Sequence, residues 1–236
     1  VTTGIAIMKA VEKQGLLPDT AAGLSLGEYE ALYAAGALSV TDAIRVVARR
    51  GELMEAAVPA GVGAMAAVLG AEASLIEETL SEIPEVWIAN YNCPGQIVIS
   101  GKKEAVEAAA EALKARGIKR VLMLNVSGPF HSGLLREAGE ALGKVLAETE
   151  IHPIRIPYYA NVTGDIVEDA AKVRGLLTEQ VYSSVRFEQS IRNMLSAGVD
   201  TFYELGPGKT LAGFVKKIDR EATVVNIETM EDLAKI

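Results

Sequence analysis

The sequence is poor in the residues on which several kinds of protein chemistry depend. Its 236 residues include only one cysteine, Cys93, and two histidines. A single cysteine excludes an intramolecular disulfide and a metal cluster held by cysteines, a pattern that is typical of a reducing compartment. We therefore expect a cytoplasmic protein, and we assign it no metal site.

Long hydrophobic runs and an excess of positive charge are also absent. The longest apolar stretches, such as residues 64–69, are far shorter than the roughly 20 residues of a membrane-spanning helix. Residues 1–10 lack the charged start and the long apolar core of a signal peptide. Lys and Arg number 23 against 31 Asp and Glu, whereas binding to phosphate groups requires a basic face. We expect neither a membrane nor a nucleic acid as a partner.

Helical and strand patterns alternate along the chain and predict an α/β fold with a mainly parallel sheet. Half of the residues are hydrophobic, which is enough for a sizeable core in a chain of this length. Ser39 and Asp42 have the spacing of a capping box and predict a helix that runs to about residue 57. In the second half we expect helices at 134–149, 169–180, 187–197 and from 210, and strands at 155–160, 201–205 and 223–227.

The middle of the chain follows a different order of elements. We predict strands at 64–69, 86–91, 96–100 and 120–124, and helices at 72–81 and 103–116. This β-α-β-β-α-β order is that of a ferredoxin-like unit, and Gly117 lies where a glycine commonly ends a helix. We therefore expect an inserted ferredoxin-like small subdomain at 61–126 and a large α/β subdomain formed by 1–60 and 127–236.

Residues 23–27, Gly-Leu-Ser-Leu-Gly, match the Gly-x-Ser-x-Gly elbow, a sharp strand-to-helix turn that exposes a serine hydroxyl beside backbone N–H groups. A run of small residues precedes the match, and a helical pattern follows it as far as Gly36. Gly23 and Gly27 have a steric reason, because the strained turn leaves no room for Cβ atoms beside the serine. Ser25 is therefore the candidate nucleophile; the alternative is a chance match in a chain with 22 glycines.

A serine hydroxyl needs a base, because an alcohol is a poor nucleophile until a neighbour takes its proton. His131 lies in a turn-rich loop after a predicted strand, where functional side chains are common. His152 precedes a proline at the start of a strand, and we interpret it as an ordinary surface residue. His131 is the candidate base, and the alternative is a loop histidine that caps backbone groups.

A catalytic triad would also need an acid, which the α/β-hydrolases carry between the serine and the histidine. The only aspartate in that interval is Asp42, which is already explained as a helix-start residue. The glutamates there fall mostly on predicted helices with polar, solvated faces. The sequence therefore predicts a Ser-His dyad, in which a backbone carbonyl holds the imidazole in one tautomer.

Five segments of the chain, in this order, resemble the malonyl-CoA:acyl-carrier-protein transacylases of fatty acid synthesis. The segments are Gly-Leu-Ser-Leu-Gly-Glu-Tyr at 23–29, Arg-Arg-Gly at 49–51, Asn-Tyr-Asn-Cys-Pro-Gly-Gln at 90–96, Gly-Pro-Phe-His-Ser at 128–132 and Glu-Leu-Gly-Pro-Gly-Lys at 204–209. The resemblance covers nearly the whole chain. It implies an α/β-hydrolase-like large subdomain with parallel strands, into which the ferredoxin-like subdomain is inserted.

The resemblance also implies a role for each matching residue. Ser25 would carry the malonyl group, and His131 would act first as base and then as acid. Arg50 would pair with the malonyl carboxylate, and the N–H of Leu26 would stabilise the oxyanion. Three further positions match the family: the Gln180 carbonyl would orient His131, Asn161 would lie near the active site, and Phe130 resembles the residue of malonyl-selecting members.

The partners implied are malonyl-CoA, as substrate, and acyl carrier protein, with no cofactor; we expect a monomer. Two basic groups are candidates for docking the carrier protein: Lys102, Lys103, Lys114, Arg116, Lys119 and Arg120 in the small subdomain, and Lys209, Lys216, Lys217 and Arg220 in the large one. Local charge governs docking more than net charge does.

The sequence departs from the family in two places. Leu24 stands where a histidine is common, which we expect to be tolerated. Family members begin with a strand and a Gly-Gln-Gly loop whose glutamine N–H is the second oxyanion donor. The present sequence has no such loop before Ser25, so we expect an amino-terminally truncated chain that lacks a central strand and half of the oxyanion hole.

Two other functions stay open at this stage. A serine thioesterase or other hydrolase would share Ser25 and His131, but it should carry an acid in the proper place and has no use for Arg50. A truncated domain that binds acyl-CoA or carrier protein without catalysis would need neither the nucleophile nor the base. Formation of a malonyl ester on Ser25 distinguishes these alternatives from the transacylase.

Overall fold

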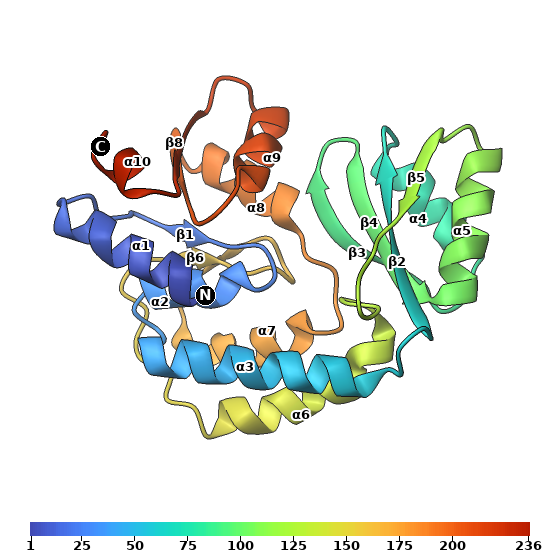
Figure 1. The fold of residues 1–236 in the computed structure, drawn as a ribbon, viewed down its shortest axis with the longest axis horizontal. Helices are drawn as coiled ribbons and strands as arrows, with labels where there is room; N and C mark the ends of the chain where they lie inside the picture. Colours follow the sequence, from blue (N-terminus) through green and yellow to red (C-terminus); the bar gives the residue numbers. More distant parts are fainter.

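The computed structural model describes residues 1–236 and has two lobes (Figure 1). The small lobe is formed by residues 63–123, and the large lobe contains the rest of the chain. Both lobes combine helices with strands, so the predicted α/β class is confirmed. No helix has the length and the apolar character needed to cross a membrane.

The small lobe has the six elements that the sequence predicts, in the predicted order. They are β2 (Gly63–Leu69), α4 (Ala73–Ser81), β3 (Val86–Cys93), β4 (Gln96–Lys102), α5 (Lys103–Ala115) and β5 (Arg120–Met123). The strands form one sheet in the order β3-β4-β2-β5, and every neighbouring pair is antiparallel. In α5, Val106, Ala109, Ala110 and Leu113 are buried at the helical spacing that covers one face of a sheet. Gly117 follows α5 at a φ of 93°, as expected of a helix-ending glycine.

The large lobe is mainly helical. Its helices are α1 (Thr2–Lys13), α2 (Gly27–Ala34), α3 (Val40–Ala57), α6 (Arg136–Ala147), α7 (Val173–Gln180), α8 (Phe187–Ser196), α9 (Thr210–Ile218) and α10 (Met230–Leu233), with short 3₁₀ helices η1 (Gly133–Leu135) and η2 (Ala170–Lys172). The Ser39 hydroxyl accepts a hydrogen bond from the Asp42 N–H at 3.0 Å, so the predicted start of α3 is confirmed. Helices α3, α6 and α7 pack together (Figure 1) around the largest hydrophobic core of the chain, which includes Leu142 and Leu177.

The strands of the large lobe form two separate short sheets instead of the one mainly parallel sheet that we expected. Strand β1 (Ala21–Ala22) pairs in parallel with β6 (Tyr158–Tyr159), which pairs antiparallel with β7 (Ile166–Val167). Strand β8 (Thr201–Leu205) pairs in parallel with β9 (Thr223–Ile227). The strand expected at 155–160 shrinks to two residues, because Pro157 has no N–H to donate to a neighbouring strand.

A cavity of about 1010 Å³ separates the two sheets of the large lobe. Residues of α1, β1 and β8 line it, and most of the lining side chains are hydrophobic. Strands β1 and β8 therefore face a common space without pairing with each other.

Candidate active site

The segment between β1 and α2 forms a sharp turn with Ser25 at its tip. Ser25 has a φ of 52°, a left-handed backbone conformation that residues other than glycine rarely adopt. A Cβ on Gly23 would collide with the Gly27 carbonyl, which confirms the steric reason given for the first glycine. A Cβ on Gly27 would meet no atom within 4 Å, so the same reason is wrong for the second glycine.

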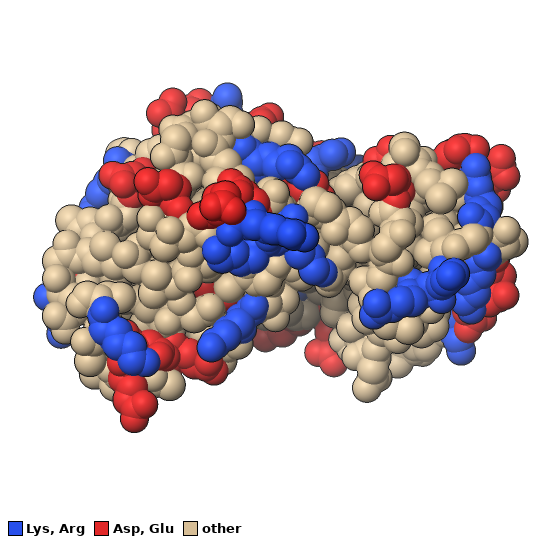
Figure 2. Space-filling model, turned by 90° about the horizontal axis from the view of Figure 1, so that it is seen from above, with Lys and Arg blue, Asp and Glu red and all other residues tan.

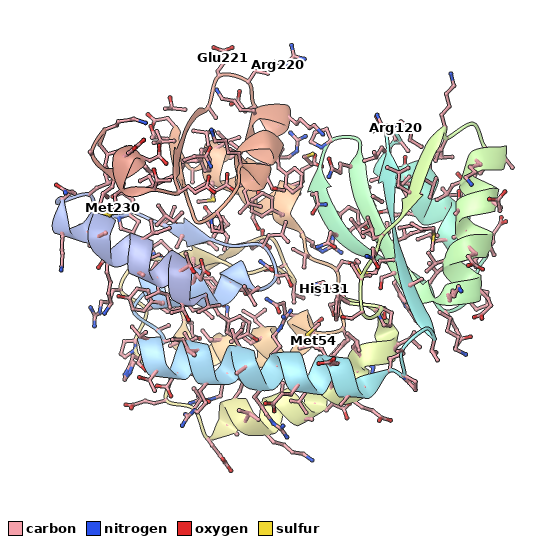
Figure 3. All side chains as sticks on the ribbon, viewed as in Figure 1. Met54, Arg120, His131, Arg220, Glu221 and Met230 are labelled. Atoms are coloured by element: carbon pink, nitrogen blue, oxygen red, sulfur yellow. The ribbon has the colours of Figure 1, made fainter.

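The fold brings Ser25 and His131 into contact although 106 positions separate them. Ser25 Oγ lies 2.7 Å from His131 Nε2. His131 Nδ1 lies 2.8 Å from the main-chain oxygen of Gln180, at the end of α7. Because a carbonyl oxygen only accepts hydrogen bonds, Nδ1 carries the proton and Nε2 is free to accept the Ser25 hydroxyl. His131 lies where the large lobe faces the sheet of the small lobe (Figure 3).

The environment of His131 keeps the imidazole neutral. Its side chain is 4% exposed. Burial, and after it the positive charge of Arg50, lowers the pKa of His131 to about 4. Hydrogen bonds with backbone groups of Gln180 and Ser183 raise the pKa but do not offset this decrease. A neutral imidazole is the form that accepts a proton, so His131 is in the state that a base requires at neutral pH.

Arg50, on α3, is a buried cation beside the hydroxyl of Ser25. Its Nη2 donates hydrogen bonds to Ser25 Oγ at 3.0 Å and to Gln180 Oε1 at 3.1 Å, and its guanidinium lies 5.8 Å from the centre of the Tyr29 ring. Its Nε is buried without a hydrogen-bond partner. A buried guanidinium with free donors and no carboxylate partner is suited to an anionic group of a ligand.

Asn161 follows β6 and holds the turn that carries Ser25. Its Oδ1 accepts a hydrogen bond from the Ser25 N–H at 2.6 Å, and its Nδ2 donates to the Gly23 carbonyl at 2.6 Å. With 1% of its surface exposed, Asn161 cannot exchange these bonds for water. It therefore braces the backbone on the amino-terminal side of the serine.

The two remaining predicted site residues flank the pair of Ser25 and His131. The N–H of Leu26 makes no hydrogen bond with another residue, so it is free to donate to a ligand. Phe130 is half-buried next to His131 and packs against core residues of both lobes, among them Met65 of β2. The structure thus brings the predicted residues together: His131, Arg50, Asn161 and Gln180 contact Ser25, and Leu26 and Phe130 are the chain neighbours of Ser25 and His131.

The sequence analysis missed Glu28. We expected most of the glutamates between Ser25 and His131 to lie on solvated helix faces, but Glu28 is 0% exposed and accepts hydrogen bonds from Gln180 Nε2 and the Asn161 N–H. It makes no hydrogen bond with His131, so it is not the acid of a triad. The signal in the sequence was its position directly after the turn, where the first residues of α2 are close to the nucleophile.

No group of three or more His, Cys, Asp or Glu side chains is arranged to hold a metal ion. The cavity of about 1010 Å³ lies on the other side of the turn, where Gly23, Leu26 and Gly27 line it but Ser25 and His131 do not. His152, at the surface, lies 3.5 Å from Glu150, and Cys93 is buried.

The fold and the site define an acyltransferase. The family described as acyl transferase domain matches residues 2–232, nearly the whole chain. The malonyl CoA-acyl carrier protein transacylase of Bacillus subtilis (strain 168) is 47% identical over 99% of this chain, which spans 75% of that protein, and that of Staphylococcus aureus (strain MRSA252) is 40% identical with 99% and 76% covered. The chain belongs to the malonyl CoA-acyl carrier protein transacylase family.

Solved structures of the same family have the same fold. The transacylase from Clostridium perfringens ATCC 13124 has a TM-score of 0.96 and 42% identity, with 99% of this chain and 75% of that chain covered. A complex of a type II polyketide synthase acyl carrier protein with its malonyl transacylase has a TM-score of 0.95 and 37% identity, with 99% and 77% covered. The chain thus spans about three quarters of the length of these relatives.

Proposed function

We propose that this chain transfers malonyl from coenzyme A to the pantetheine thiol of acyl carrier protein, in fatty acid synthesis, through a malonyl ester on Ser25. The observation that carries the proposal is the contact of Ser25 Oγ with both a neutral imidazole at 2.7 Å and an unpaired buried guanidinium at 3.0 Å. The first supports nucleophilic attack, and the second supports recognition of a substrate that carries a carboxylate.

In the first half-reaction Ser25 Oγ attacks the thioester carbonyl carbon while His131 Nε2 takes the hydroxyl proton. The carbonyl oxygen becomes an oxyanion that the Leu26 N–H stabilises; one such donor contributes about 10² to 10³ in rate. The intermediate then collapses, the C–S bond breaks, and coenzyme A leaves with the proton held by His131. An ester of malonate on Ser25 remains.

In the second half-reaction the carrier-protein thiol gives its proton to His131 and its sulfur attacks the ester carbonyl carbon. Thiols have a pKa of about 8.5, so the thiol gives up its proton more readily than the serine hydroxyl does in the first half-reaction. Collapse of the second intermediate breaks the C–O bond, and Ser25 Oγ recovers its proton from His131. The Gln180 carbonyl keeps Nδ1 protonated throughout, which leaves Nε2 to carry the moving proton.

Arg50 selects the substrate in this proposal. A planar guanidinium binds a carboxylate through its N–H groups. Nη2 already donates to Ser25 Oγ and Gln180 Oε1, so Nη1, which makes no hydrogen bond in the structure, is the donor left for the substrate carboxylate. An acetyl group has no carboxylate, so it would leave the buried charge unpaired. Phe130, next to His131 in the chain, resembles the residue of malonyl-selecting family members, which supports a preference for malonyl over branched relatives.

The carrier protein would dock on basic side chains near the junction of the lobes. Figure 2 shows Lys and Arg gathered near the middle of the upper face and on the small lobe. In the small lobe Lys102, Lys114 and Arg116 pair with carboxylates. In the large lobe Lys216 donates to a backbone carbonyl and Lys217 to Gln96 Oε1, so both keep their charge uncompensated. The large-lobe group is thus the better partner for an acidic protein.

The finer description of the fold belongs to this proposal. We infer an inserted ferredoxin-like subdomain at 61–126 and an α/β-hydrolase-like large subdomain at 1–60 and 127–236. The antiparallel strand order β3-β4-β2-β5 supports the first, and the parallel pairs β1-β6 and β8-β9 support the second. The monomeric state, the absence of a cofactor and the cytoplasmic location stay predictions.

The test is the intact mass of the chain after mixing with malonyl-CoA, with Ser25→Ala as the control. We expect one malonyl group on the unmodified chain, none on Ser25→Ala, and its loss when carrier protein with a free pantetheine thiol is added. Release of free malonate faster than transfer to carrier protein would show a thioesterase. Absence of the ester, with malonyl-CoA still bound, would show a domain that binds without catalysis.

A further inference from the structure

Glu28 is the one acidic side chain that the fold buries completely, at 0% exposure. Burying a carboxylate is costly unless nearby groups compensate it. Glu28 lies three positions after Ser25, in the first turn of α2, and it takes no part in the proton transfers described above. Its burial beside the nucleophile therefore needs a reason of its own.

The contacts of Glu28 lead to the two residues that hold the backbone of Ser25. Its Oε2 accepts hydrogen bonds from Gln180 Nε2 at 2.7 Å and from the Asn161 N–H at 3.3 Å. Gln180 Nε2 also donates to the Ser25 carbonyl at 2.9 Å, and Asn161 accepts from the Ser25 N–H. Both ends of the Ser25 peptide are thus tied to groups that Glu28 holds.

The chemistry of these groups permits only one orientation of the Gln180 side-chain amide. A carboxylate and a carbonyl only accept hydrogen bonds, so the NH₂ group must face Glu28 and Ser25. The amide oxygen then faces Arg50, whose guanidinium only donates, at 3.1 Å. The reverse orientation would set NH₂ against the guanidinium and oxygen against the carboxylate.

Gln180 in turn contacts all three reactive groups of the site. Its main-chain oxygen accepts from His131 Nδ1 at 2.8 Å, and its side-chain oxygen accepts from Arg50 Nη2, which also donates to Ser25 Oγ. Gln180 is 0% exposed, so no water replaces these bonds. A group that fixes Gln180 therefore fixes the base and the cation relative to the nucleophile.

We propose that Glu28 is a positioning residue, which clamps the Gln180 amide and so aligns His131 and Arg50 with Ser25. The inference rests on the proposed transacylase function and adds to it a residue that touches neither substrate nor reacting atoms. The clamp requires an oxygen that accepts hydrogen bonds at the position of Oε2, and it does not require a full negative charge.

The other oxygen of Glu28 shows why a neutral side chain can replace the carboxylate. Oε1 is buried without a partner, as are the hydroxyls of Tyr29 and Tyr158. Burial, and after it the charge of Glu28, raises the pKa of both tyrosines. Burial raises the pKa of Glu28 itself to about 7. A glutamine at this position would keep the accepting oxygen toward Gln180, and its NH₂ group would take the place of Oε1, which accepts no hydrogen bond in the structure.

The experiment compares Glu28→Ala, Glu28→Gln and the control Glu30→Ala. Glu30 is the other carboxylate of α2; it lines the cavity on the other side of the turn and makes no hydrogen bond with a residue of the site. We would measure the single-turnover rate of Ser25 malonylation per reactive serine, the preference for malonyl-CoA over acetyl-CoA, and the melting temperature. We expect about a 100-fold lower rate and a weaker malonyl preference for Glu28→Ala, since misplacing reacting groups by about 1 Å costs that much.

Glu28→Gln should recover at least about a third of the unmodified rate, because it retains the acceptor. The proposal is wrong if Glu28→Ala equals Glu30→Ala in rate per reactive serine, or if Glu28→Gln loses as much as Glu28→Ala. Reaction of Ser25 with a sulfonyl fluoride, which needs the dyad but no malonyl, separates this outcome from failure of the proposed function. If the chain does not accept malonyl but Glu28→Ala still slows the reaction with the sulfonyl fluoride and Glu28→Gln still recovers it, the proposed function is wrong and the positioning role of Glu28 is supported.

Discussion

The lowered pKa of His131 predicts how the reactivity of Ser25 changes with pH. The reaction with a sulfonyl fluoride is the cleanest assay: Ser25 Oγ bonds to sulfur, fluoride leaves, and His131 takes the proton. This reagent has no carboxylate of its own, whereas a malonyl carboxylate titrates in the same acidic range. The rate should follow the neutral fraction of His131, because only the neutral imidazole takes the proton.

The size of the effect follows from the burial of the imidazole and from the nearby positive charge of Arg50. With the pKa at about 4, about 90% of His131 is neutral at about pH 5, whereas an ordinary histidine with a pKa of about 6.5 would be only about 3% neutral. The two cases differ about 30-fold in rate at that pH. We expect the rate of Ser25 sulfonylation to be nearly constant from about pH 8 to about pH 5 and half-maximal at about pH 4.

Arg50→Gln tests the second cause of this shift. The charge of Arg50 lowers the pKa of His131, and burial, which comes first, remains in the variant. The midpoint should therefore rise to a value between about 4 and about 6.5. Arg45→Gln is the matched control, because Arg45 lies on the same helix but is exposed and pairs with Asp42, and it should leave the midpoint unchanged.

A midpoint near about 6.5 in the unmodified chain would refute the reasoning, since it would mean that His131 is hydrated and not buried beside Arg50. An unchanged midpoint in Arg50→Gln would refute the electrostatic part alone. Circular dichroism at each pH keeps loss of the fold apart from protonation of the base.

Two further predictions concern the surface and the support of the site. Replacing both Lys216 and Lys217 with glutamate should slow transfer to carrier protein about tenfold at low salt and spare transfer to free pantetheine, since charges at the rim of an interface act mainly on association. The control is Lys114→Glu, because Lys114 already pairs with a carboxylate. Equal loss with both acceptors would contradict the docking surface. Asn161→Ala should lower the free energy of unfolding by about 1–3 kcal/mol, because it leaves the Ser25 N–H and the Gly23 carbonyl without their partner. Chemical denaturation measures this loss, and an unchanged midpoint would show that the turn around Ser25 does not depend on the hydrogen bonds of Asn161.

Much of the secondary structure could be predicted from local patterns. All six elements of the small lobe follow from four runs of hydrophobic strand residues, two amphipathic helices and the helix-ending Gly117, signals that act over a few residues. The strand expected at 155–160 was too long, since prolines remove donors that a pattern of hydrophobic residues does not reveal. The separation of β1 from β8 was not foreseen, because sheet pairing depends on contacts between segments far apart in the chain.

The sequence by itself determined the chemistry that this chain can offer. A serine between glycines, a histidine in a loop and the absence of a suitable aspartate already predict a dyad, because residue type and local backbone decide which groups can attack and which can accept a proton. It could not determine which of these groups meet.

Only the tertiary structure decided that Ser25 and His131 lie 2.7 Å apart, that the Gln180 carbonyl holds the imidazole, and that Glu28 is buried. The reason is physical: burial and pKa depend on what packs around a side chain, and those neighbours come from α3, α7 and β6, which are remote in sequence. From the sequence alone Glu28 was expected to be a solvated helix residue, because the residues that bury it lie in these remote elements.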